Sequence, residues 1–156
     1  MIIYFANRSM QIIGQASTTL PGGLLVSGDT KREEVDSGTA SFDCYVEYAG
    51  KAERKDVEQM AAVGNYLLRA VDGEGEFYTI IDSELDTKNG TVYIYSEDAG
   101  LDLLNEIVGE YSAASAMTIA QYTAIFTADS GFEIGVNEVS TYSRTLEWEG
   151  EATVTA

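Results

Sequence analysis

The chain has 156 residues, a length typical of one domain, and the hydrophobic share of 45% is usual for a globular protein. It carries 26 acidic and nine basic side chains, a formal net charge of -17, which excludes nucleic acid and anionic lipid headgroups as partners because both require Lys and Arg. The single cysteine excludes an internal disulfide, and the absence of His removes the commonest general base and metal ligand.

The first third of the chain has the composition of β-structure. Short apolar runs at residues 2–6 and 11–16 predict a β-hairpin, and Pro21-Gly22-Gly23 marks a turn after it. Residues 24–35 begin apolar and become charged, with Gly28-Asp29 as a candidate turn. Ten tyrosines among the aromatic residues favour a substantial amount of sheet, since such rings fit a pleated, half-buried surface.

Residues 39–48 show a clear strand pattern. Phe42, Cys44, Val46 and Tyr48 alternate with polar or exposed positions, and a period of two places these four on one face of a sheet. Cys44 therefore falls on the apolar face, where we predict an unreactive buried thiol.

The middle of the chain contains a helix followed by paired strands. Helical spacing predicts a short helix over 53–63, closed by Gly64-Asn65. The apolar run 65–71, the turn 72–75 and the strand 77–81 follow. Asn89-Gly90 before the β-rich residues 91–95 is the strongest hairpin signal in the sequence, because both turn residues accept a positive φ.

The last third predicts two further helices and two strands. Asp98 caps a helix at 99–108, a second helix covers about 116–127, and alternation predicts strands at 132–136 and 141–148. The fold class that follows is α+β and β-rich, with antiparallel sheets or a small barrel and two or three short helices. We expect one structural domain over residues 1–156, and we expect the full protein to continue beyond Ala156.

Motifs of catalysis and metal binding are not found. Without His there is no usual base for a Ser or Cys nucleophile, one Cys cannot form a zinc site, and Gly73-Glu74-Gly75 lacks the context of a phosphate loop. Two rows of alternating carboxylates, at residues 82–86 and 147–151, have the oxygen ligands of a weak cation site, but neither matches an EF-hand loop and both are more typical of a solvated strand face. We therefore predict no enzyme, no catalytic residue, no cofactor and no metal site.

Seven aromatic residues fall on predicted strands and helices and admit three interpretations. They are half-buried sheet residues, a subunit interface, or an aromatic surface that binds a sugar. The residues are Tyr45, Tyr66, Tyr78, Tyr93, Tyr95, Tyr122 and Trp148.

The order of these segments resembles a known protein family. An N-terminal hairpin leads to SGDTKREEVDSGTASFDCYV, GNYLLRA, GEFYTIIDSELDTKNGTVYIYSEDAGLDLLNE and TLEWEGEAT, and the stretch Phe77 to Leu104 is the most specific. The pattern is similar to the N-terminal region of phage and prophage minor structural proteins of long-tailed phages of Gram-positive bacteria. These are tail-tip hub or tail-associated proteins, some of which are labelled prophage tail endopeptidases.

The resemblance implies a β-rich fold like the N-terminal domains of baseplate hubs, a homotrimer in the full-length assembly, and other tail proteins as partners. It also implies that hydrolase or receptor-binding activity, where present, lies in later domains, and no catalytic motif carries over to any residue here. The expected function is a virion structural component at the tail tip that links the tail tube to downstream fibre or lysin domains. The alternative function is a carbohydrate- or receptor-binding module.

The sequence also bears on localisation. The start of the chain lacks the basic region of a signal peptide, and no apolar run approaches the roughly 20 residues of a membrane span. We expect synthesis in the bacterial cytoplasm and a final place in the virion.

The second half of the chain is the more acidic, since residues 79–156 hold 14 acidic and two basic side chains. Two hypotheses follow for this acidic half: it faces a basic surface of a neighbouring tail protein, or it lines a lumen and repels the DNA that passes through.

Overall fold

The computed structural model describes residues 1–19, 23–34, 39–105, 107–128, 141–149 and 152–153. The chain divides into two compact units, Met1–Gly100 and Leu101–Ala156, which we call unit 1 and unit 2. The single domain that we predict over residues 1–156 stays a prediction, because two compact units can still unfold together. The predicted turn residues 21–22 and the predicted strand 132–136 lie outside the described residues.

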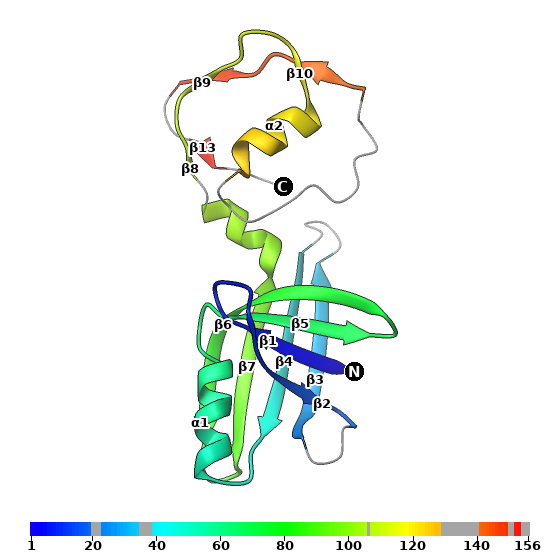
Figure 1. Cartoon of the computed structure of the whole chain (residues 1–156), viewed down its shortest axis with the longest axis vertical. Coiled ribbons are helices and arrows are strands. Elements are labelled where there is room, and N and C mark those ends of the chain that lie inside the picture. The colour runs from blue at the N-terminus through cyan, green and yellow to red at the C-terminus, as the bar shows by residue number, and fades with distance from the viewer. Residues whose placement is uncertain (20–22, 35–38, 106, 129–140, 150–151, 154–156) are drawn as a thin grey trace. The chain divides into compact units, whose positions relative to one another are not determined.

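Unit 1 is a closed β-barrel (Figure 1). Its seven strands follow the order β1-β2-β3-β4-β7-β6-β5 around the barrel, and β5 pairs back to β1 to close it. This arrangement confirms the coarse prediction of a β-rich fold. The strands are β1 (Ile2–Ala6), β2 (Ile12–Ser17), β3 (Leu24–Glu34), β4 (Thr39–Glu47), β5 (Tyr66–Val71), β6 (Glu74–Asp86) and β7 (Thr91–Asp98).

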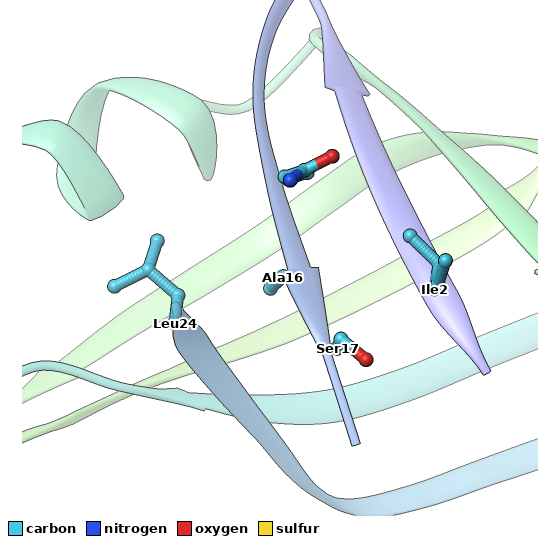
Figure 2. Close-up of a pocket in the computed structure, with 5 residues that line it drawn as sticks. Ile2, Ala16, Ser17 and Leu24 are labelled. Carbon is cyan, nitrogen blue, oxygen red and sulfur yellow. The ribbon is translucent and has the colours of Figure 1, made fainter. Parts of the chain in front are cut away.

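One pair of strands in the barrel departs from the antiparallel pairing that the sequence predicts. β2 and β3 run parallel, and their register covers only Ala16 opposite Leu24 and Ser17 opposite Leu25. A pocket of about 20 Å³ lies at this short pair, lined by Ile2 and Gln15 as well (Figure 2). A space of that size holds about one water molecule, so the pocket is not a ligand site.

The predicted hairpins and the pattern of β4 are confirmed. β1 pairs with β2, and β6 pairs with β7 across the turn that contains Asn89-Gly90, where Gly90 has a φ of 70°. In β4, Phe42, Cys44 and Val46 are fully buried as the period of two predicts. Burial raises the pKa of the Cys44 thiol to about 12, with smaller contributions from Asp29 and Asp43, and this agrees with an unreactive thiol.

Two strands of the barrel contain a β-bulge, and one of them, β6, is longer than predicted. The candidate turn at Gly28-Asp29 is a bulge within β3, where the register against β4 shifts between Ser27 and Thr30. The predicted strand 77–81 extends to Asp86, with a second shift between Ile80 and Asp82. Each bulge lets its strand stay paired to a neighbour while one residue is left out of the ladder.

The helix α1 (Lys51–Met60) begins two residues earlier and ends three residues earlier than predicted. It buries Val57 and Met60 in the barrel core. The predicted left-handed cap at Gly64 is wrong, because the helix closes earlier, at Ala61, which has a φ of -83°. Gly64 has its positive φ in the turn that follows, and the Asn65 amide donates hydrogen bonds of 3.0 and 3.2 Å to the carbonyl oxygens of Gln59 and Met60. The core residues are Ile3, Phe5, Ala16, Val26, Phe42, Cys44, Val46, Val57, Met60, Ala61, Leu67, Tyr78, Ile80, Val92 and Ile94.

Unit 2 is built from short elements. Its described strands pair as β8 with β13, β9 with β12 and β10 with β11, each pair antiparallel. The elements from the boundary onward are the 3₁₀ helix η1 (Ala99–Asn105), β8 (Ile107–Val108), β9 (Tyr111–Ser112), β10 (Met117–Thr118), α2 (Ile119–Phe126), β11 (Ser143–Arg144), β12 (Glu147–Trp148) and β13 (Ala152–Thr153).

Three predictions for this region need correction. The predicted helix 99–108 is a 3₁₀ helix followed by a short strand. Asp98 caps the start as predicted, by accepting a hydrogen bond from the Gly100 amide, but the β-branched pair Ile107–Val108 favours an extended backbone. The predicted helix 116–127 begins only at Ile119, because Thr118 forms a capping box with Gln121. The predicted strand 141–148 is two short strands that pair with different partners.

Four aromatic rings pack together in unit 2. Tyr111 lies within 5.1 Å of the rings of Phe126 and Trp148, and Tyr122 stacks on Phe126 at 5.9 Å. The Tyr122 hydroxyl donates to the Arg144 carbonyl at 2.7 Å, and the Trp148 Nε1 donates to the Gly109 carbonyl at 3.0 Å. The polar tips thus hold the irregular backbone around the rings. No helix in the described part of the chain has both the length and the apolar character to cross a membrane.

The β3 bulge provides a test of the fold. Gly28 has a φ of 60°, and a Cβ there would lie 3.0 Å from Cδ2 of Tyr45. We expect Gly28→Ala to lower the free energy of unfolding by about 1–2 kcal/mol in urea denaturation, since non-glycine residues are strained in this region.

The matched control is Gly50→Ala, where an added methyl meets no atom within 4 Å. An equal loss of stability in both variants would contradict the role of the bulge.

Candidate functional site

The outward surface of β4, β7 and β6 carries three tyrosines beside four carboxylates. The cross-strand register places Tyr45 opposite Tyr93, and Tyr93 opposite Glu84; Tyr95 lies between Asp43 and Asp82 in the next row. We call this surface the tyrosine–carboxylate face. Its residues are Asp43, Tyr45, Asp82, Glu84, Tyr93, Tyr95 and Glu97.

The tyrosine rings are accessible but held in place. Tyr45 is 42% exposed, and its ring centroid lies 5.2 Å from that of Tyr93 with a tilt of 49°. The Tyr95 hydroxyl donates to Glu97 Oε1 at 2.9 Å, and this bond raises the pKa of Tyr95. Burial, followed by the charge of Asp43, raises the pKa of Tyr93. Both phenols are thus neutral across the physiological range.

The carboxylates of this face differ in their surroundings. Asp43 is buried and accepts a hydrogen bond of 2.6 Å from Nη1 of Arg32, which comes from β3. Asp82 and Glu84 are exposed, and neither forms an ion pair with a residue that the structure describes. The face therefore keeps two open carboxylates next to two tyrosine rings.

A second outward surface has no charged side chain. On β1, β5 and β6, Tyr4 lies opposite Leu68, and Leu68 lies opposite Phe77, which is 45% exposed. We call this surface the uncharged face, and its residues are Ile2, Tyr4, Tyr66, Leu68, Ala70 and Phe77. In a chain with so many carboxylates, an uncharged sheet surface with one exposed and two half-buried aromatic rings is the type of surface that proteins use for contacts.

Partly exposed side chains of β3, β5 and β6 form an ion-pair cluster beside the barrel core, which we call the interior cluster. Lys31 from β3 pairs with Glu76 and, at 2.5 Å, with Glu33. Arg69 from β5 donates to Glu76 Oε2 at 2.7 Å, and the Tyr78 hydroxyl donates to the same oxygen at 3.1 Å. Burial acts to raise the pKa of Glu76, but the hydrogen bonds from Lys31, Arg69 and Tyr78 outweigh it and lower the pKa.

This cluster neutralises its own charges and leaves no free base or acid for catalysis. Burial raises the pKa of Tyr78 to about 12, with a further contribution from Glu76, so its phenol does not titrate near neutral pH. The Arg69 guanidinium lies 5.6 Å from the centre of the Phe42 ring, and its Nε has no hydrogen-bond partner in the described part of the chain. The cluster therefore fits a structural role in joining β3, β5 and β6.

The predicted carboxylate rows do not form metal sites where the structure describes them. Asp82 and Glu84 belong to the tyrosine–carboxylate face. Asp86 instead closes the β6–β7 turn, accepting bonds from the backbone amides of Lys88 and Asn89 and from the Asn89 side chain. Among the described residues, no group of three His, Cys, Asp or Glu is arranged to hold a metal ion. Of the second row, Glu151 lies outside the described residues.

The seven aromatic residues of the sequence analysis separate into different places. Tyr45, Tyr93 and Tyr95 come together on one face, Tyr66 lies on the uncharged face, and Tyr78 is inside the barrel. Tyr122 and Trp148 belong to the aromatic cluster of unit 2. We did not predict from the sequence that Glu84 and Asp82 lie opposite tyrosines. The signal was present in the Asn89-Gly90 hairpin, since the register of that hairpin sets both pairs.

Comparisons with known proteins add no relationship. No family model matches the sequence, and no curated protein is significantly similar to it.

The interior cluster makes stability depend on pH. The folded pKa of Glu76 lies below its unfolded value, so its contribution is present above about pH 4.5 and is lost as the pH falls further. We expect Glu76→Gln to cost about 1 kcal/mol at pH 7, because Lys31 and Arg69 lose their shared counter-charge while solvent screens the partly exposed pair. The measurement is chemical denaturation at pH 7 and at lower pH.

The variant should lose less additional stability than the wild type on acidification, since the group that titrates has been removed. Glu74→Gln makes the same change at an exposed site on the same strand and serves as the control. An unchanged pH dependence in the Glu76→Gln protein would rule out this role for the cluster.

Proposed function

We propose that this chain is a non-enzymatic structural component of a phage tail tip or baseplate, and that it links the tail tube to downstream fibre or lysin domains. The single observation that carries the proposal is the barrel of unit 1, which presents the uncharged face and the tyrosine–carboxylate face on its outer surface. Both surfaces suit contacts with other proteins, and neither suits chemistry.

The family resemblance supports the same function. Its most specific stretch, Phe77 to Leu104, covers most of β6, the following turn, β7 and most of η1, so most of these motif residues belong to unit 1 and the last four begin unit 2. The resemblance implies a homotrimer in the full-length assembly, and we propose the uncharged face as its contact surface. Because this face has no carboxylates, copies that meet there avoid the electrostatic repulsion expected of a chain with a net charge of -17.

The acidic residues of the chain fit a protein neighbour better than a lumen in this proposal. Exposed carboxylates beside accessible rings, as at Glu84 and Tyr93, are suited to a basic protein surface. Carboxylates that only repel DNA would need no aromatic neighbours. The expected place of the chain is therefore the virion, in contact with other tail proteins, after synthesis in the bacterial cytoplasm.

The test is peptide mass spectrometry on tail particles purified from an induced lysogen of the source strain. We expect peptides of this chain at a few copies per particle when counted against the major tail protein. Phe77→Asp should reduce the yield of complete particles by about tenfold or more, because it buries a charge in the proposed contact. Well-assembled particles without this chain, in cells that contain the protein, would overturn the proposal.

Val63→Asp is the matched control for this experiment. Val63 is 59% exposed and lies outside the uncharged face, so the same chemical change should leave the particle yield unaffected. A comparable loss in both variants would indicate a general effect on the protein and would count against the proposed contact.

The alternative function is a carbohydrate- or receptor-binding module. The observation that favours it is the exposed ring of Tyr45, which packs against Tyr93, the residue opposite the open carboxylate of Glu84. The tilt of 49° between Tyr45 and Tyr93 counts against it, because the two rings do not form one flat surface for a sugar. On this alternative, the chain binds defined glycans on an array and Tyr45→Ala abolishes binding, while Tyr66→Ala does not. If the chain binds none of the glycans on the array, the alternative function is wrong.

A further inference from the structure

The tyrosine–carboxylate face contains two equivalent pairs at a fixed spacing. Tyr93 of β7 lies directly opposite Glu84 of β6, and Tyr95 lies directly opposite Asp82. The two pairs are two residues apart along both strands, so they lie on the same side of the sheet at a separation of about 7 Å.

Each pair offers the two groups that a guanidinium binds. The ring face attracts a cation, and the adjacent carboxylate accepts hydrogen bonds from the flat edge of an arginine side chain. An ammonium makes these two contacts less well, because it is a compact, strongly hydrated charge without a flat face. The chemistry of the pairs therefore selects arginine over lysine.

The same surface already binds one guanidinium of this chain. Arg32 reaches from β3 to Asp43, which lies on the other side of Tyr95, at 2.6 Å. Asp82 and Glu84 remain exposed, and among the described ion pairs neither takes part. The face thus has one carboxylate occupied by an arginine and two equivalent ones open, which makes it complementary to a segment with positive charge.

The spacing indicates the conformation of that segment. In an extended chain, residues i and i+2 point to the same side and are about 7 Å apart, which equals the separation of the two pairs. A partner strand lying along β7 would therefore place alternate side chains over Tyr93–Glu84 and Tyr95–Asp82.

We propose that the tyrosine–carboxylate face binds an extended segment of a partner protein that carries arginine at every second position. This inference deepens the proposed function, since it names the chemistry of a neighbouring tail protein, and it rests on that function for the identity of the source. The carboxylates supply attraction, and the rings supply the preference for arginine.

The test uses isothermal titration calorimetry of the whole chain with three synthetic seven-residue peptides at about physiological ionic strength. One alternates threonine and arginine, one replaces each arginine by lysine, and one has the first composition with its arginines consecutive. We expect the alternating arginine peptide to bind about fivefold or more tightly than either of the others. Equal affinity for the arginine and lysine peptides would overturn the proposal.

Charge variants separate this face from general acidity. Asp82→Asn with Glu84→Gln should weaken binding of the alternating arginine peptide by about tenfold, because both pairs lose their carboxylate. The control, Asp56→Asn with Glu74→Gln, removes the same two charges at exposed positions of α1 and β6 outside the face, and should change affinity less than about twofold. Equal losses in the two double variants would show nonspecific attraction and would contradict the proposal.

A variant that removes a tyrosine ring without changing the charge tests the proposal even if the carboxylate variants alter the fold. Tyr93→Leu retains an apolar side chain on the sheet but removes the cation-binding ring, so the preference for arginine over lysine should fall by about threefold while circular dichroism stays unchanged. Binding of a neutral oligosaccharide that displaces the peptide would instead favour the carbohydrate alternative. The outcome is independent of the particle experiment. If tails contain this chain but the face shows no preference for the arginine peptide, this inference is refuted and the proposed function is not.

Discussion

Closure of the barrel by the pairing of β1 with β5 is the constraint on which the arrangement of unit 1 depends. β1 has β2 on one side and β5 on the other, so the N-terminal strand has no free edge. In a closed sheet each side chain points either into the core or outward, and its two cross-strand neighbours are fixed by register. The tyrosine–carboxylate face and the uncharged face are consequences of this geometry, since each is a set of outward positions on adjacent strands.

The interior shows how the barrel accommodates charge. Lys31, Arg69 and Glu76 come from β3, β5 and β6, and they share hydrogen bonds instead of standing alone. Removing Glu76 would leave Lys31 and Arg69 without their shared counter-charge, but solvent moderates the cost because the three side chains are 19–34% exposed. The cluster therefore specifies which strands face each other across the barrel, and it has no role in the outward binding that we propose.

Local pattern was sufficient to predict several elements. The alternation in β4, the hairpin around Asn89-Gly90 and the burial of Cys44 follow from a period of two and from turn chemistry, which act within a few residues. The parallel contact of β2 with β3 and the closure by β1 and β5 could not be predicted, because they join segments through the geometry of the whole barrel. The 3₁₀ turn at Ala99–Asn105 was missed because its apolar spacing is also that of a helix.

The two bulges explain why the candidate site was only partly visible in the sequence. A period of two that starts from the buried Ile80 would place Asp82 and Glu84 inside the barrel, but the residue left out at Ile81 moves both to the outer surface.

The bulge in β3 acts in the same way. A strict alternation from the buried Val26 would direct Arg32 inward, whereas the extra residue between Ser27 and Thr30 turns Lys31 toward Glu76 and Arg32 toward Asp43. One inserted residue in each strand thus determines which charges stabilise the interior and which form the outer face. The tyrosines of β4 and β7 need no such correction, because those strands pair with each other without a shift. The face therefore combines tyrosines that sequence periodicity places correctly with carboxylates that the register of the β6–β7 hairpin sets opposite them and that the β6 bulge leaves on the outer surface.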